Sequence, residues 1–231
     1  MIGVLKKKVN DTLNLNKLIF KKNLSKINFG NASILDRKKS IIYIKGTGFE
    51  LENLKSTNIS ICKFNYKNEI VEQNSIKPSV DVYTHLYLYN KYKNINTIIH
   101  THSKYATILA QLEIEPECFG TTHADFFKNK IPLSKKIKNV NKKQYEIQIG
   151  ETIFQKIKNN YDTIPGILVC NHGCYVWGKD SSTAIYNAEA IELICELYYY
   201  SKLISKKSKI SKNLMNFHFN RKHGPKKYYG Q

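Results

Sequence analysis

The sequence lacks any apolar stretch that approaches the roughly 20 residues needed to cross a lipid bilayer. Its first ten residues carry lysines but no following apolar block, so they do not read as a secretory signal. The five cysteines are an odd number and show no framework spacing. We therefore expect a cytoplasmic protein with reduced thiols and no membrane partner.

Arginine is almost missing, with Arg37 and Arg221 standing among 37 basic residues. Readers of nucleic acids favour arginine, because its guanidinium group forms paired hydrogen bonds. The net charge of +19 comes instead from lysines scattered through almost every segment. As a hypothesis, we ascribe the excess of lysine to drift in amino-acid composition in an AT-rich genome. Tight, specific DNA or RNA binding at physiological salt would refute this hypothesis. We expect no nucleic-acid partner, although the basic surface should attract anionic substrates.

The 231 residues are long enough for one sizeable core, and the pattern shows no linker or internal repeat. Mixed helices and strands in no strict βαβ order predict one α/β domain over 1–231, with a central, mainly antiparallel sheet flanked by helices. Periodicity predicts helices over 4–20, 81–91, 104–111, 145–158 and 182–204. Strands are expected over 41–44, 59–62, 95–99 and 167–170, with a turn over 29–33.

A pair of histidines, His100 and His102, ends the strand expected over 95–99, and a third, His172, follows the strand expected over 167–170. Residues two apart on a strand face the same side, so both imidazoles can grip one ion. Three protein ligands with an open position are typical of catalytic zinc. The trio therefore favours a metal site over structural histidines.

Two further segments could handle an anion. In Lys45-Gly46-Thr47-Gly48, glycines allow backbone N–H groups close to an anion, although a plain hairpin turn is at least as consistent. Ser79 could supply a second hydroxyl, or could instead cap the helix that follows.

The run Gly120–Asp125 contains two hydroxyls, an imidazole and a carboxylate, which are groups that can donate or accept protons. Such groups suit acid–base chemistry, but the pattern alone also fits a polar loop.

Four segments together resemble the L-ribulose-5-phosphate 4-epimerases of the class II aldolase/adducin family. These are His100–Ser103, Gly120–Asp125, His172–Lys179 and the C-terminal Arg221–Gln231. The resemblance covers essentially the whole chain. It implies a zinc enzyme, with one ion per subunit, that interconverts L-ribulose 5-phosphate and D-xylulose 5-phosphate. The C3–C4 bond is cleaved and re-formed, and both fragments stay in the pocket.

The resemblance also implies roles for individual residues. The metal ligands would be His100, His102 and His172, with Asp81 as a further ligand. Asp125 and Tyr229 would be the two acid/base groups, with Tyr229 reaching a neighbouring subunit's site in a cyclic tetramer of four subunits. The phosphate positions would be Gly30, Asn31, Thr47, Gly48, Ser79 and Val80.

Some positions depart from the family pattern. Val80 stands where a second serine is common, Gly46 where a proline is usual, and Thr47 where a serine is usual. A lost hydroxyl removes a hydrogen bond to a charged group, worth about 1.5–3 kcal/mol. We therefore expect weaker phosphate binding but intact chemistry.

Two other functions stay open. A class II sugar-phosphate aldolase shares the histidines, but typically has Glu at the position of Asp81. An adducin-like scaffold without catalysis is the non-enzymatic alternative, and the presence of all three histidines argues against it.

Overall fold

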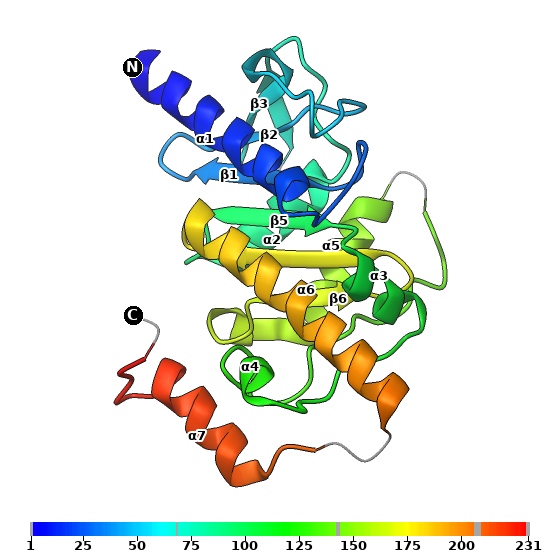
Figure 1. Ribbon diagram of the computed structural model, residues 1–231. Helices are drawn as coiled ribbons and strands as arrows, with labels where there is room; N and C mark the ends of the chain where they lie inside the picture. Colours follow the sequence, from blue (N-terminus) through cyan, green and yellow to red (C-terminus); the bar gives the residue numbers. More distant parts are fainter. Residues whose placement is uncertain (1, 68, 142–143, 206–208, 230–231) are drawn as a thin grey trace.

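The computed structural model describes residues 2–67, 69–141, 144–205 and 209–229 (Figure 1). The helices are α1 (Ile2–Lys21), α2 (Val82–Lys91), α3 (Lys104–Gln111), α4 (Thr121–Ala124), α5 (Tyr145–Ile157), α6 (Ser181–Ile204) and α7 (Lys212–His223). The strands are β1 (Asn31–Asp36), β2 (Ile41–Lys45), β3 (Ile59–Phe64), β4 (Ile70–Gln73), β5 (Thr97–Thr101), β6 (Gly166–Val169) and β7 (Gly173–Gly178). Short 3-10 turns span Ser56–Asn58 and Lys158–Asp162.

Within the described residues, seven strands form one sheet in the order β4-β3-β2-β1-β5-β7-β6. Each neighbouring pair is antiparallel, which confirms the expected α/β domain with a central antiparallel sheet. β5 lies inside the sheet between β1 and β7, and all five of its residues are buried. A strand paired on both sides holds its side chains rigidly, so the end of β5 suits a functional site.

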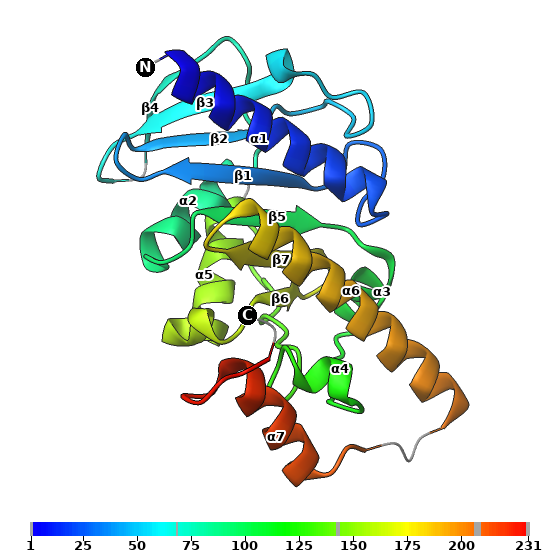
Figure 2. The ribbon, with the colours of Figure 1, turned by 60° about the vertical axis from the view of Figure 1, so that its left-hand side comes forward.

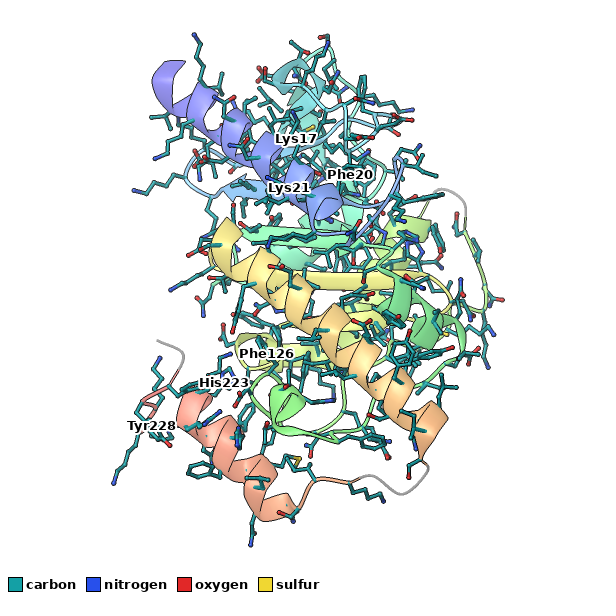
Figure 3. The ribbon with its side chains drawn as sticks, viewed as in Figure 1. Lys17, Phe20, Lys21, Phe126, His223 and Tyr228 are labelled. Atoms are coloured by element: carbon teal, nitrogen blue, oxygen red, sulfur yellow. The ribbon has the colours of Figure 1, made fainter. Side chains whose placement is uncertain are left out.

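Helices cover both faces of this sheet. On one face, α1, α3 and α6 bury apolar side chains against β1, β5 and β7 (Figure 2). On the other face, α2 and α5 pack on each other and on the same strands. Residues that alternate along β5 therefore serve two cores: Ile99 joins the first and Ile98 the second. Lys17 and Lys21 stand on the exposed side of α1 (Figure 3).

The five expected helices and four expected strands are confirmed, with ends displaced by two residues or fewer. The expectation of a turn over 29–33 is wrong in its second half, because β1 already begins at Asn31 and pairs with β5 there. The sequence did not predict β4, β7, α4 or α7.

None of the helices in the described part of the chain has the length and apolar character needed to cross a membrane.

Candidate functional site

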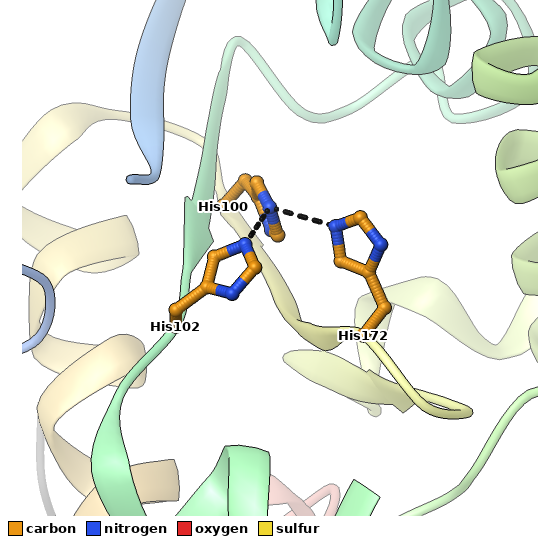
Figure 4. Close-up of side chains that lie close together, drawn as sticks. All are labelled: His100, His102 and His172. Carbon is orange, nitrogen blue, oxygen red and sulfur yellow. Dashed lines mark hydrogen bonds between the residues drawn. The ribbon is translucent and has the colours of Figure 1, made fainter. Parts of the chain in front are cut away.

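Three imidazoles from two distant segments meet at the end of β5 (Figure 4). His100 is in β5, His102 directly follows that strand, and His172 lies in the turn between β6 and β7. His100 Nε2 lies 3.0 Å from His102 Nε2 and 3.1 Å from His172 Nε2. Among the described residues, this is the one group of three or more His, Cys, Asp or Glu side chains that could hold a metal ion.

Protein groups hold each of the three histidines, two of them at the ring and His102 at its backbone. His100 Nδ1 lies 3.0 Å from the carbonyl of Cys174, and when it donates there the Nε2 lone pair faces the other two rings. The backbone N–H of His102 donates to Ser25 Oγ at 2.8 Å. His172 Nδ1 lies 3.3 Å from the Tyr145 hydroxyl. These partners leave the three Nε2 atoms free to converge.

The chemistry of this donor set fits a divalent metal. Burial lowers the pKa of His100 to about 3, and burial also lowers the pKa values of His102 and His172. The rings are therefore neutral near pH 7, as metal ligands must be. One His100 lone pair cannot satisfy two facing N–H groups, whereas a cation between the rings accepts all three lone pairs.

The predicted phosphate residues Gly30 and Asn31 lie beside this centre. Asn31 pairs with His100 across the β1–β5 ladder. Gly30 has a φ of +75°, and an added Cβ would come within 2.7 Å of the His100 carbonyl oxygen and 2.8 Å of Ser25 Oγ, so glycine is needed here. The Asn31 amide donates to Ser79 Oγ at 3.2 Å, which joins two of the predicted phosphate segments.

The loop with Thr47 and Gly48 is tied to the segment that carries Ser79. The Thr47 N–H donates to the Lys77 carbonyl at 3.0 Å, and the Ser79 N–H donates to the Lys45 carbonyl at 2.9 Å. The three predicted phosphate segments are thus linked, and Val80, next to Ser79, is 52% exposed. The alternative role of Ser79 as a helix cap is not observed, because Asp81 occupies the N-cap of α2.

Lys45 places a cation under these loops. Its side chain is buried, and Nζ donates to the carbonyls of Asn28 at 3.2 Å and Phe49 at 2.8 Å. Burial lowers the pKa of Lys45 to about 8, against the opposing attraction of Asp81. The ammonium group therefore remains mostly charged near pH 7 and gives these loops a positive charge.

Asp81 lies next to the centre but outside the compact three-histidine group. Its Oδ1 accepts from the Tyr175 hydroxyl at 3.0 Å, and its Oδ2 accepts from Asn31 Nδ2 at 2.6 Å. Burial acts to raise the pKa of Asp81, but His100, His85 and the Tyr175 hydroxyl outweigh it and lower that pKa below its usual value. The carboxylate is therefore a half-buried negative charge beside the histidines.

Asp125 and Tyr229 belong to a separate cluster between α4 and α7. Asp125 Oδ1 lies 3.1 Å from His218 Nδ1, and Arg221 Nη2 donates to both carboxylate oxygens at 3.2 Å. The Tyr229 ring lies 4.1 Å from the Arg221 guanidinium carbon. Figure 3 places His223 of α7 at the same junction, where its Nε2 lies 2.8 Å from the Asp125 carbonyl.

In the described residues, no hydrogen bond or ring contact joins Asp125 or Tyr229 to the three histidines. Gly230 and Gln231, the end of the C-terminal motif, lie outside the described residues. The structure therefore brings together the predicted metal and phosphate residues, while the two predicted acid/base residues lie together elsewhere.

Sequence reasoning missed Tyr175, Tyr145 and Ser25, which all hold metal-site residues in place. One signal could have identified Tyr175. The run Gly173–Gly178 is apolar, aromatic and bounded by glycine, which is typical of a buried strand, and it forms a hairpin with 166–169. Recognising that strand would have placed Tyr175 near His172.

The model of the class II aldolase and adducin N-terminal domain matches residues 10–199. The chain belongs to this family. The chain is similar to the solved structure of an L-fuculose 1-phosphate aldolase, with 20% sequence identity and a TM-score of 0.77. The match covers 93% of this chain and 95% of the other. It is also similar to YgbL from Escherichia coli, with 20% identity, coverages of 93% and 98%, and a TM-score of 0.74.

A third similar structure is the L-fuculose 1-phosphate aldolase from Glaciozyma antarctica PI12. The identity is 12%, the coverages are 94% of this chain and 81% of the other, and the TM-score is 0.74. At these identities the likeness establishes a shared class II aldolase fold. The class II aldolase domain thus carries a histidine cluster able to bind a divalent metal at the end of a central strand.

Proposed function

We propose that this protein is a zinc-dependent epimerase that interconverts L-ribulose 5-phosphate and D-xylulose 5-phosphate, with one zinc ion per subunit. The observation that supports it is the convergence of three imidazole Nε2 atoms, one of them from the buried His100, beside the linked loops predicted to bind phosphate. In the reaction, the C3–C4 bond breaks, the aldehyde fragment turns its other face, and the bond re-forms.

The bound metal supplies a Lewis acid that offsets negative charge on the sugar oxygens. The protein's own groups do the rest. The backbone of Gly30 and Gly48 and the polar side chains of Asn31, Thr47 and Ser79 bind the phosphate, together with the backbone at Val80. Since both fragments remain bound, re-addition is effectively unimolecular.

We propose that Asp125 and Tyr229 hold and move protons on opposite faces of the aldehyde. Inversion requires a proton donor on each side of the carbonyl, so two residues from different segments are needed. Tyr229 is 47% exposed and contacts Arg221 in its own chain. We propose that it serves the site of a neighbouring subunit in a cyclic tetramer, which would account for its separation from its own histidines.

The test uses purified protein and L-ribulose 5-phosphate, with D-xylulose 5-phosphate as the measured product. Activity should vanish with a chelator and return with zinc. His102→Asn should abolish both zinc binding and activity, because one of three ligands is lost. Cys170→Ala is the matched control, since Cys170 lies two residues from His172 but outside the histidine group. Zinc binding without any product would refute the epimerase.

The second candidate is a sugar-phosphate aldolase. It is favoured by the similarity to structures named as L-fuculose 1-phosphate aldolases. The same assay separates the two functions: an aldolase releases free aldehyde together with dihydroxyacetone phosphate, whereas the epimerase retains both fragments.

We also propose that the chain works as one unit over 1–231, because α7 packs on α4 through Arg221 and Asp125. The proposed location is the cytoplasm. All five cysteines are free thiols, as a reducing compartment favours.

A further inference from the structure

Helix α3 begins two residues after the metal-site residue His102, and a carboxylate from another helix holds its first turn. Ser103 is the N-cap residue of α3, but its side chain makes no capping hydrogen bond. Glu192 of α6 takes that role. Its Oε1 accepts from the backbone N–H of Tyr105 at 2.9 Å, and its Oε2 accepts from that of Ala106 at 3.0 Å. Two N–H groups that no carbonyl within the helix can reach are thereby paired.

The contact with Glu192 matches what the start of a helix requires. A carboxylate is favoured at a helix N-terminus, where the N–H groups carry partial positive charge. Because its two oxygens bind two successive N–H groups, Glu192 fixes the direction of α3 as well as its starting point. Glu192 is half-buried where α3 and α6 pack on each other (Figure 2). It is not a member of the three-histidine group, so any effect it has on a metal acts through α3.

The backbone of His102 depends on this anchor more than that of His100 does. His100 lies within β5, where it is paired with β1 on one side and β7 on the other. The β5–β7 ladder ends at Thr101, so His102 lies beyond it. The backbone N–H of His102 donates to Ser25 Oγ at 2.8 Å, and the next residue is already the N-cap of α3. The position of His102 is therefore set largely by where α3 begins.

We propose that Glu192 is a positioning residue for the metal centre, which fixes the backbone of His102 by binding the first N–H groups of α3. Nitrogen ligands of one tetrahedral ion lie roughly 3.3 Å apart. His102 Nε2 lies 3.0 Å from His100 Nε2, close to that spacing, and release of α3 would allow this distance to change. The proposal rests on the proposed metal centre and leaves the choice of further ligands open.

The test measures the binding of Co²⁺, the metal alone, by its visible absorption, which responds to the arrangement of the ligands. Glu192→Gln keeps the size of the side chain but removes its charge and one of its two acceptors. We expect the Kd for Co²⁺ to rise about tenfold, as for other groups that orient metal ligands. The absorption bands should also change, because His102 is no longer held in one position.

Glu189→Gln is the matched control for the loss of charge. Glu189 lies three residues earlier on α6 and accepts from Lys22 Nζ at 2.8 Å near the surface. Its Kd for Co²⁺ and its absorption bands should equal those of the unaltered protein. Amide hydrogen exchange at Tyr105 and Ala106 should become faster in Glu192→Gln and stay unchanged in the control, which ties the effect to α3.

A second variant separates positioning from general unfolding. Glu192→Asp keeps the charge and both acceptors but draws them back by one methylene group, so its Kd should lie between those of the unaltered protein and Glu192→Gln. Urea unfolding of the metal-free variants shows which of them are folded, and Glu192→Asp decides the test if Glu192→Gln is not.

Two outcomes would contradict the expectation in different ways. If the folded Glu192 variants show the Kd and absorption bands of Glu189→Gln, the proposal is overturned and Glu192 is a structural cap of α3 alone. Failure of the unaltered protein to bind Co²⁺ would overturn the metal centre itself, so the two failures are distinguishable.

Discussion

His123 shows what burial does to a single titratable side chain in this protein. It lies in α4, it is 4% exposed, and its Nε2 has no hydrogen-bond partner among the described residues. Burial lowers its pKa to about 4, against about 6.5 in an unfolded chain. The folded protein therefore keeps this imidazole neutral where the unfolded chain would protonate it.

Replacing His123 should flatten the pH dependence of stability. Between pH 6.5 and 4 the unfolded state binds a proton that the folded state refuses, so stability falls as pH falls through this window. At pH 5 the loss from His123 should be about 2 kcal/mol. Urea unfolding of the metal-free protein at pH 7 and pH 5 measures it. His123→Asn should lose less stability on acidification than the unaltered protein; parallel pH profiles would contradict the expectation.

The sequence predicts the grouping of the three histidines but not the residues that support them. His100 and His102 are two apart on a strand, and His172 follows another, so local spacing was enough to group them. The role of Tyr175 depends on which strand pairs with β5 and in what register, which is long-range information. The partners of Asp125 likewise come from α7, whose polar sequence has no marked apolar face.

Gly46 is the point where the loop after β2 meets the segment before α2, through a bridge to Pro78. A Cβ there would lie 2.6 Å from Ile76 Cγ2 and 2.9 Å from the Asn58 carbonyl oxygen. Gly46→Ala should therefore destabilise the protein by about 1–3 kcal/mol and raise KM for a sugar phosphate.

Urea unfolding and steady-state kinetics test the Gly46 prediction. Gly3→Ala in α1 is the matched control, because nothing lies within 4 Å of its added Cβ, and a helical alanine should keep or raise stability. Equal stability of the two variants would show that the loop yields to accommodate the methyl group.

α7 should depend on Arg221 for its docking. Arg221 reaches both oxygens of Asp125 and lies against Tyr229, which a lysine cannot reproduce although it keeps the charge. In Arg221→Lys, we expect faster amide hydrogen exchange across 212–223 with unchanged exchange in α6. Lys226→Arg, on the exposed C-terminal segment, is the control. Unchanged exchange in α7 would show that its other contacts suffice.

At the scale of elements, β-branched strands and long amphipathic helices were predictable, whereas short or atypical elements were not. β4 has four residues and is largely exposed, so it carries no apolar alternation. Helix α4 has four residues, too few to show a repeating apolar pattern along the helix. β7 was not predicted because all six of its residues are buried, so it has no alternation of apolar and polar side chains, although its aromatic run is distinctive.

The whole molecule carries a net charge of +19, which should draw phosphorylated sugars toward it. Salt screens such attraction over about 10 Å at 0.1 M ionic strength. We expect KM for the sugar phosphate to rise between 0.05 and 0.5 M NaCl, while kcat changes little. A series in KCl checks for a specific ion effect. A KM that does not respond to salt would show that the distributed lysines do not steer the substrate.

The positions of the three histidines have a consequence for the stability of the folded chain. A metal shared by His100 and His172 ties together two points 72 positions apart. Such a link between distant segments would stabilise the folded chain, in a protein whose five cysteines are all free. Unlike a disulfide, it can be undone by withdrawing the ion. We therefore expect molecules without metal to be degraded faster by proteases, so that metal supply would affect the lifetime of the protein.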